Sequence, residues 1–117
     1  MTDAHELGRA GEDTAAAWYQ RGGYVVLDRN FRVAAGEIDL VLARRAMVIF
    51  CEVKTRSSDR FGVGAEAVGY RKQQRIRAVA LVWLRQDERR WSEIRFDVAS
   101  LQRHAHGFSV EVIEAAF

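Results

Sequence analysis

Two short apolar runs near the middle of the chain constrain the fold more than any other feature. They cover residues 37–43 and 47–55, and only three residues separate them. Runs of this length that are rich in valine and isoleucine predict strands, and so short a connection predicts an antiparallel hairpin. Charged side chains nevertheless interrupt both runs, although charged residues are rarely buried without a partner. These charges therefore need either a structural partner or a function.

The charged residues of the two runs are expected to meet. Side chains alternate across a strand, so Glu37 and Asp39 share one face, and Glu52 and Lys54 share one face. If the hairpin is centred between positions 45 and 46, a loop of two or four residues places Asp39 directly opposite Glu52. A loop of odd length or a bulge would shift this pairing.

Two opposed carboxylates favour a divalent cation between them. Directly opposed residues have Cβ atoms about 4.5–5.5 Å apart, and carboxylates at that separation repel each other, more strongly when they are buried. Two carboxylates, the Val53 carbonyl and water molecules suit Mg²⁺, which prefers oxygen ligands. Lys54 could then place positive charge near a phosphate or orient an attacking water. This set fits phosphodiester hydrolysis better than glycosidase or acyl-transfer chemistry.

A structural interpretation of the same residues stays open. Asp39 and Glu52 could each pair with an arginine, and Lys54 could reach solvent from the end of a strand. Charge elsewhere is uneven, although the net charge is only +2. Residues 1–20 hold four acids and one base, whereas residues 71–90 hold seven bases and two acids. Such asymmetry suggests an anionic partner for one face, and a solvated helix face is the alternative.

Composition excludes several other classes of protein. Hydrophobic residues make up 49 % of the chain, which argues against disorder. No run approaches the ~20 apolar residues of a membrane helix, and the first residues do not resemble a secretory signal. Cys51 is the only cysteine, so we expect no internal disulfide, no structural zinc site and a cytoplasmic location.

The remaining pattern predicts one domain over residues 1–117 with an α/β fold. Helices are expected over about 3–21 and 67–85, and further strands over 24–31, 94–101 and 108–115. The order is αβββαββ, with a central mixed sheet flanked by helices. Asp3 is expected to cap the first helix, and residues 56–65 are expected to form a mobile loop. The apolar faces expected for the helices are Leu7, Ala10, Thr14 and Trp18 in the first, and Val68, Ile76, Val79, Ala80 and Trp83 in the second.

Several segments resemble the YraN-like family of predicted endonucleases. They are "GRAGEDTAAAWYQRGGYVVLDRNFR", "GEIDLV" and "FCEVKTR", and the similarity extends through "RFGVGAEAVGYRKQQRIRAVALVWL", "RFDVASL" and "IEAAF" to nearly the whole chain. That family is similar to archaeal Holliday junction resolvases and to the restriction-endonuclease-like group. The resemblance implies a restriction-endonuclease-like fold and a Mg²⁺- or Mn²⁺-dependent endonuclease acting on DNA, with branched or flapped DNA as one option.

The resemblance also implies roles for individual positions. Asp39 corresponds to the motif aspartate, and Glu52 and Lys54 supply the E-x-K motif. Glu12 matches the first-helix glutamate that helps related nucleases to bind metal or water; an exposed helix acid is the alternative. The candidates for contact with nucleic acid are Arg9, Thr55, Arg56, Arg71, Lys72, Gln73 and Arg75, with Arg32 and Ser57 as further options.

Two other functions stay open. The chain could be a non-catalytic nucleic-acid-binding module that keeps the nuclease fold, or a protein-interaction domain whose charges form ordinary ion pairs. Resolving a four-way junction takes two cuts, so a homodimer is a further expectation to test. Its aromatic interface candidates are Trp91, Phe108 and Phe117, which could equally pack in the core.

Overall fold

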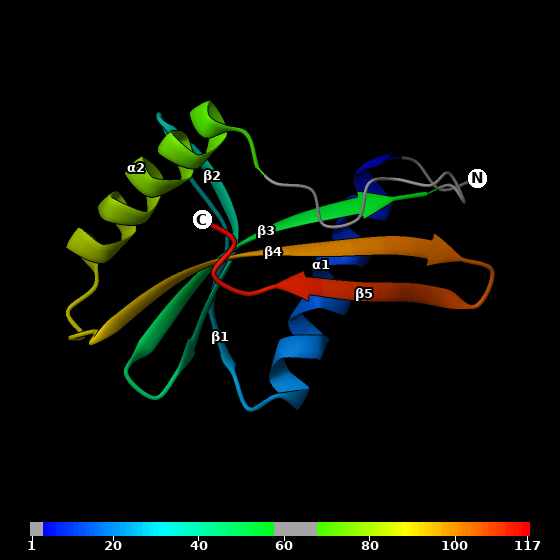
Figure 1. Cartoon of the computed structure of the whole chain (residues 1–117), viewed down its shortest axis with the longest axis horizontal. Coiled ribbons are helices and arrows are strands. Elements are labelled where there is room, and N and C mark those ends of the chain that lie inside the picture. The colour runs from blue at the N-terminus through cyan, green and yellow to red at the C-terminus, as the bar shows by residue number, and fades with distance from the viewer. Residues whose placement is uncertain (1–3, 58–67) are drawn as a thin grey trace.

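The computed structural model describes residues 4–57 and 68–117 and contains a five-stranded sheet with one helix on each face (Figure 1). The order of elements confirms the predicted αβββαββ arrangement. The elements are α1 (Ala4–Arg21), β1 (Val25–Val33), β2 (Gly36–Arg44), β3 (Met47–Arg56), α2 (Tyr70–Gln86), β4 (Glu93–His104) and β5 (Gly107–Ile113).

The sheet is mixed, as predicted. Its strands lie in the order β1-β2-β3-β4-β5. Neighbouring strands are antiparallel except β3 and β4, which run parallel and are connected through α2. Asp3 and most of the loop predicted over 56–65 lie outside the described residues, whereas Arg56 is the last residue of β3. Neither helix of the described part of the chain is long and apolar enough to cross a bilayer.

The core has two parts, one under each helix. The predicted stripe of α2 is confirmed for Ile76, Val79, Ala80 and Trp83, which are buried against β2, β3 and β4. Val68 is buried in the same cluster but precedes the helix, which begins at Tyr70 rather than at the predicted residue 67.

The predicted face of α1 is only partly buried: Leu7, Ala10, Thr14 and Trp18 are half-buried, and Trp18 packs against the core under this helix. Its buried residues are Gly11, Ala15, Ala16 and Tyr19, because small side chains let this helix lie close to the sheet. A Cβ at Gly11 would overlap the side chain of Thr55, so the interpretation gave too much weight to large apolar residues.

The β2–β3 hairpin has the predicted register. Its paired residues run from Arg44–Met47 to Leu40–Cys51, which centres the turn between positions 45 and 46. No glycine is present there, and Arg45 itself adopts the left-handed conformation with φ of 56°. A two-residue hairpin turn needs such backbone angles, so the register holds at the cost of an unusual arginine conformation.

Beyond this hairpin the two strands separate, and we call the place where they part the fork. From Leu40 backwards, β2 continues beside β1, whereas from Cys51 onwards β3 continues beside β4. In Figure 1, β2 begins beside the start of α2, whereas the end of β3 leads away from that helix alongside β4. Asp39 and Glu52 are the first residues of each strand past the last β2–β3 pair. The fork therefore opens the sheet at the position of the two predicted acids.

A buried polar network fixes the α1 side of the sheet. Asp97 is fully buried, and both its oxygens accept hydrogen bonds from the guanidinium of Arg95, at 2.8 and 2.9 Å. The Tyr19 hydroxyl donates to Asp97 at 2.7 Å, and the backbone N–H of Ala115 donates at 3.1 Å. Burial is the main cause that raises the pKa of the Tyr19 hydroxyl. The network thus connects α1, β4 and the end of the chain.

The aromatic candidates for a dimer interface pack against the core. Trp91 and Phe117 are partly buried against the cluster under α2, and Phe108 against the cluster under α1. Phe117 also stacks on Phe96 with ring centroids 5.2 Å apart. The homodimer stays a prediction, without support from these three residues.

Candidate functional site

The fork contains a pocket of about 190 Å³ on the α2 side of the sheet. Four of the predicted site residues line it together: Asp39 from β2, Glu52 from β3, and Lys72 and Arg75 from α2. Alternation along β3 explains the placement of Glu52, because its neighbours Cys51 and Val53 pack toward α1. The remaining lining residues are Gly36, Glu37 and Ile76.

Asp39 has the most perturbed environment of the pocket. Its Oδ2 accepts a hydrogen bond of 2.7 Å from the backbone N–H of Val53. Burial, followed by repulsion from Glu52, raises the pKa of Asp39 to about 7, while the Val53 hydrogen bond opposes the shift. Among the described residues, no arginine pairs with Asp39. Within residues 4–57 and 68–117, Asp39 therefore lacks the arginine partner that the structural alternative predicted.

The Val53 carbonyl is oriented toward the same opening. The N–H and C=O of one residue in a strand point to the same neighbouring strand, and the Val53 N–H points toward Asp39. Its carbonyl therefore faces β2, which has already left β3 at this position. The metal ligands predicted from the sequence are thus two carboxylates and one carbonyl directed into the fork.

Glu52 has a lysine rather than an arginine as its partner. The Nζ of Lys72 lies 2.7 Å from Oε1 of Glu52. The Glu52 side chain is 12 % exposed and the Lys72 side chain 43 % exposed. Lys72, predicted to contact nucleic acid, is thus directed into the acidic site.

Glu12 lies in an adjoining pocket of about 300 Å³, between α1 and β1. Glu37 lines both pockets and so connects Glu12 with the fork. Glu12 is half-buried, which contradicts the exposed alternative. Burial raises its pKa, a hydrogen bond with Asn30 opposes the shift, and repulsion from Glu37 adds to it. Sequence reasoning missed Asn30, whose signal was an asparagine inside a strand pattern; its φ is 52°.

The other predicted residues of β3 are divided between the two faces. Lys54 lies on the side of Glu52 by alternation and is half-buried, but it does not line either pocket. Thr55 points to the opposite side, where it packs against Gly11 of α1. Arg56 is half-buried at the end of β3.

The remaining candidates for contact with nucleic acid differ in exposure and in the contacts that their side chains already make. Arg71 is exposed at the start of α2. The Gln73 side chain instead donates to the Val68 carbonyl at 2.7 Å and so supports the beginning of the helix. In the pocket of Glu12, Arg9 hydrogen-bonds His5 at 2.8 Å, and Arg32 forms an ion pair of 2.7 Å with Glu37.

The described residues contain no group of three or more histidine, cysteine, aspartate or glutamate side chains arranged to hold a metal. A metal at the fork would therefore take two carboxylates, from Asp39 and Glu52, with the Val53 carbonyl and water. Mg²⁺ tolerates such a set, because it keeps several waters and often uses only one or two carboxylates. The repulsion that raises the pKa of Asp39 is what a bound cation would relieve, so these residues fit the ion.

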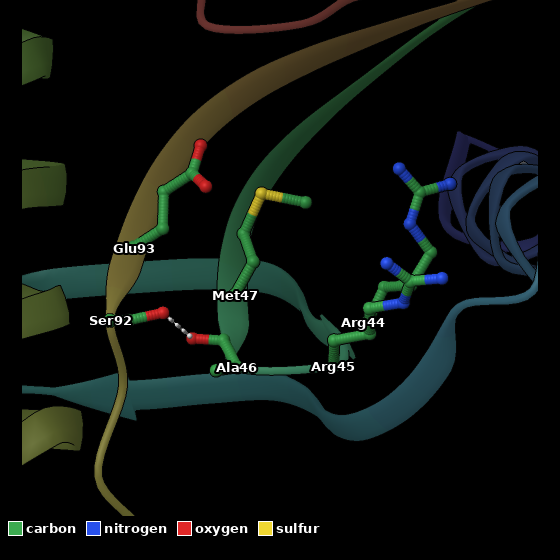
Figure 2. Close-up of a pocket in the computed structure, with 6 residues that line it drawn as sticks. All are labelled: Arg44, Arg45, Ala46, Met47, Ser92 and Glu93. Atoms are coloured by element: carbon green, nitrogen blue, oxygen red, sulfur yellow. Dashed lines mark hydrogen bonds between the residues drawn. The ribbon is translucent and has the colours of Figure 1, made fainter.

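A second hollow, of about 500 Å³, lies at the other end of the hairpin. Figure 2 shows the guanidinium groups of Arg44 and Arg45 on one side and the carboxylate of Glu93 on the other, with Met47 between them. Ser92 donates to the Ala46 carbonyl at 3.3 Å. This hollow contains one acid, Glu93, whereas the fork brings two carboxylates together.

Comparison with known proteins relates most of the chain to one family. The family described as "Uncharacterised protein family UPF0102" matches residues 11–101. A UPF0102 protein of Frankia alni is 48 % identical over 112 residues, covering 95 % of this chain and 93 % of the relative. One from Rhodococcus opacus is 43 % identical, covering 95 % of each chain. A third, from Dictyoglomus turgidum, is 40 % identical, covering 82 % of this chain and 81 % of the relative.

Proposed function

Because this chain belongs to the UPF0102 family, the YraN-like family that its motifs resemble, we propose that it is a metal-dependent endonuclease that hydrolyses DNA phosphodiester bonds. One observation carries the proposal: Asp39 and Glu52 share a pocket in which their mutual repulsion helps to raise the pKa of Asp39. A protein has little reason to bury two repelling carboxylates together unless a cation joins them.

The proposal assigns a separate role to each residue of the site. Asp39, Glu52 and the Val53 carbonyl would hold the ion, which would supply positive charge to the phosphate and lower the pKa of a water molecule. Lys54, on the side of Glu52, positions the attacking water or offsets the charge that develops on the phosphate. Glu12 extends the row of acids formed by Glu37, Asp39 and Glu52, because Glu37 also lines the pocket of Glu12. We call these four residues the acidic line.

Cations flank this acidic line on two sides, which favours a phosphate backbone as the partner. Arg71 and Arg75 lie on α2, and Arg9 and Arg32 lie by the pocket of Glu12. Contacts from such side chains position a nucleic acid without reading its sequence. DNA as substrate, a homodimer and a cytoplasmic location remain parts of the proposal.

A cleavage panel tests the activity directly. Linear, nicked, flapped and four-way DNA are incubated with Mg²⁺ or Mn²⁺ and the wild-type protein, the Asp39→Asn variant or the Lys54→Ala variant. Wild-type protein is expected to cut at least one substrate, and each variant to lose about 10²–10³-fold in rate. Arg85→Gln, which removes one cation from the last turn of α2, is the control and should cut like the wild type.

A non-catalytic nucleic-acid-binding domain is the second candidate. The ion pair between Lys72 and Glu52 favours it, because that pair already neutralises one of the two acids. Salt-sensitive DNA binding without cleavage by any preparation, at any metal concentration, would establish this candidate and end the nuclease proposal.

A further inference from the structure

We propose that Lys72 competes with the metal ion for Glu52 and, once the ion has displaced it, becomes a contact for a substrate phosphate. Metal binding and DNA binding would then strengthen each other through one side chain. The inference rests on the proposed nuclease function, and it concerns how that site is loaded.

The geometry of the ion pair makes Lys72 the partner that can move. Its Nζ lies 2.7 Å from Glu52 Oε1. The Glu52 carboxylate is largely enclosed and is held on β3, whereas nearly half of the Lys72 side chain is exposed. A flexible four-carbon side chain with a route to solvent can turn away without moving the backbone, so an arriving cation can take Glu52 while the sheet stays in place.

The charges of α2 explain where Lys72 would then go. This helix carries five cations and no acid, and its first turn lacks the acidic residue that helix starts favour. Glu52 supplies the missing negative charge from β3. Once a metal ion holds Glu52, the start of α2 and its cations Arg71, Lys72 and Arg75 have lost this anion. A DNA phosphate beside the ion is the anion that replaces it.

A purely structural lysine makes the opposite prediction. If Lys72 serves to hold Glu52 in the correct position for the metal, its removal weakens metal binding. If Lys72 competes with the metal, its removal strengthens metal binding. The sign of the change separates the two roles.

The first experiment measures metal binding alone, by calorimetry with Ca²⁺ and with Mg²⁺ at pH 8 in the absence of DNA. Lys72→Gln is expected to bind either ion about fivefold more tightly, which is the upper range for a partly exposed ion pair. Lys72→Arg keeps the charge and should bind the ions as the wild type does. Arg85→Gln is the matched control: it removes the same charge from the other end of α2 and should leave the affinity unchanged.

The second experiment measures DNA binding with Ca²⁺ and without metal, at one salt concentration. In the wild type, Ca²⁺ is expected to strengthen binding, and in Lys72→Gln this enhancement should fall by about fivefold. Glu52→Gln releases Lys72 without any metal, so it should strengthen metal-free DNA binding. Adding Lys72→Gln to that variant should abolish the gain, whereas adding Arg85→Gln should preserve it.

Two results would overturn the inference while leaving the nuclease proposal intact. One is wild-type cleavage of DNA together with unchanged or weaker metal binding by Lys72→Gln. The other is wild-type cleavage with the same Ca²⁺ enhancement of DNA binding in wild type and Lys72→Gln. A wild-type protein that binds no divalent cation, with or without DNA, would overturn both proposals.

Discussion

Two aspartates on opposite faces of the sheet have contrasting surroundings. Asp97, on the α1 side, accepts hydrogen bonds from Arg95, Tyr19 and the backbone of Ala115. Asp39, at the fork, accepts one from the Val53 backbone and lies close to the carboxylate of Glu52. Both interrupt strands that otherwise read as apolar.

The difference separates an acid whose charge is balanced within the fold from an acid that fits the proposed metal site. Asp97 has its own guanidinium, so its charge is balanced within the chain. Asp39 faces other acids, so its balance must come from a proton or an added cation. Replacing Asp97 should therefore cost stability, and replacing Asp39 should cost function.

The largest expected effect on stability is that of Asp97→Ala. This change removes the buried partner of Arg95, whose side chain is only 12 % exposed, and leaves it the longer contact of 3.5 Å with the exposed Glu114. Removing one partner of a buried ion pair typically costs about 3–5 kcal/mol, and chemical denaturation would measure the loss. Asp39→Ala is the comparison, and a similar loss for both variants would remove the distinction between the two acids.

The pH dependence of stability should come from Asp39. Its pKa is about 7 in the folded chain, against an ordinary value of 3.8. Between about pH 4 and pH 7 the folded protein holds a proton that the unfolded chain has released. The stability of the metal-free protein should therefore fall as pH rises through this window, by up to about 4 kcal/mol. In urea denaturation series, Asp39→Asn should lack this slope; if it keeps the slope, Asp39 is not its source.

Added metal is expected to stabilise the folded protein only through the residues of the fork. At pH 8, Mg²⁺ at ten times its dissociation constant is expected to stabilise the wild type by about 1.4 kcal/mol. Thermal melts with and without Mg²⁺ would show the shift in Tm. Asp97→Asn should keep this shift, whereas Asp39→Asn should lose it, and an equal shift in both variants would place the metal elsewhere.

The smallest expected effect is that of Arg32→Gln. Its ion pair with Glu37 spans 2.7 Å, but the Arg32 side chain is 76 % exposed. Exposed pairs contribute about 0.2–1 kcal/mol or less, so stability should change by no more than about 0.5 kcal/mol. A loss above 2 kcal/mol in denaturant titrations would show that exposure is a poor guide to the weight of an ion pair in this molecule.

The element order and the hairpin register could be predicted from the sequence because they depend on local pattern. Alternation set the faces of Glu52 and Lys54, and the spacing of the two runs set the pairing of β2 with β3. The resemblance to a family added Glu12, which spacing alone could not identify.

Other features depend on contacts between distant segments and could not be read from the pattern. The partner of Glu52 is twenty residues away on α2, and nothing in the spacing favours Lys72 over Arg71 or Arg75. The role of Asp97 required Arg95 and Tyr19 to meet across the sheet. The close contact of α1 depends on the small side chain of Gly11, which hydrophobic periodicity ignores.

The two-residue turn at positions 45 and 46 has a consequence for the evolution of this site. Asp39 and Glu52 face each other only because that turn has its present length, although it lies six residues from Asp39, or about 20 Å along the strand. Inserting or deleting one residue there would send one carboxylate to the opposite face. A lineage could thus silence the site while every one of its side chains stayed unchanged, and a search for lost motif residues would overlook the event.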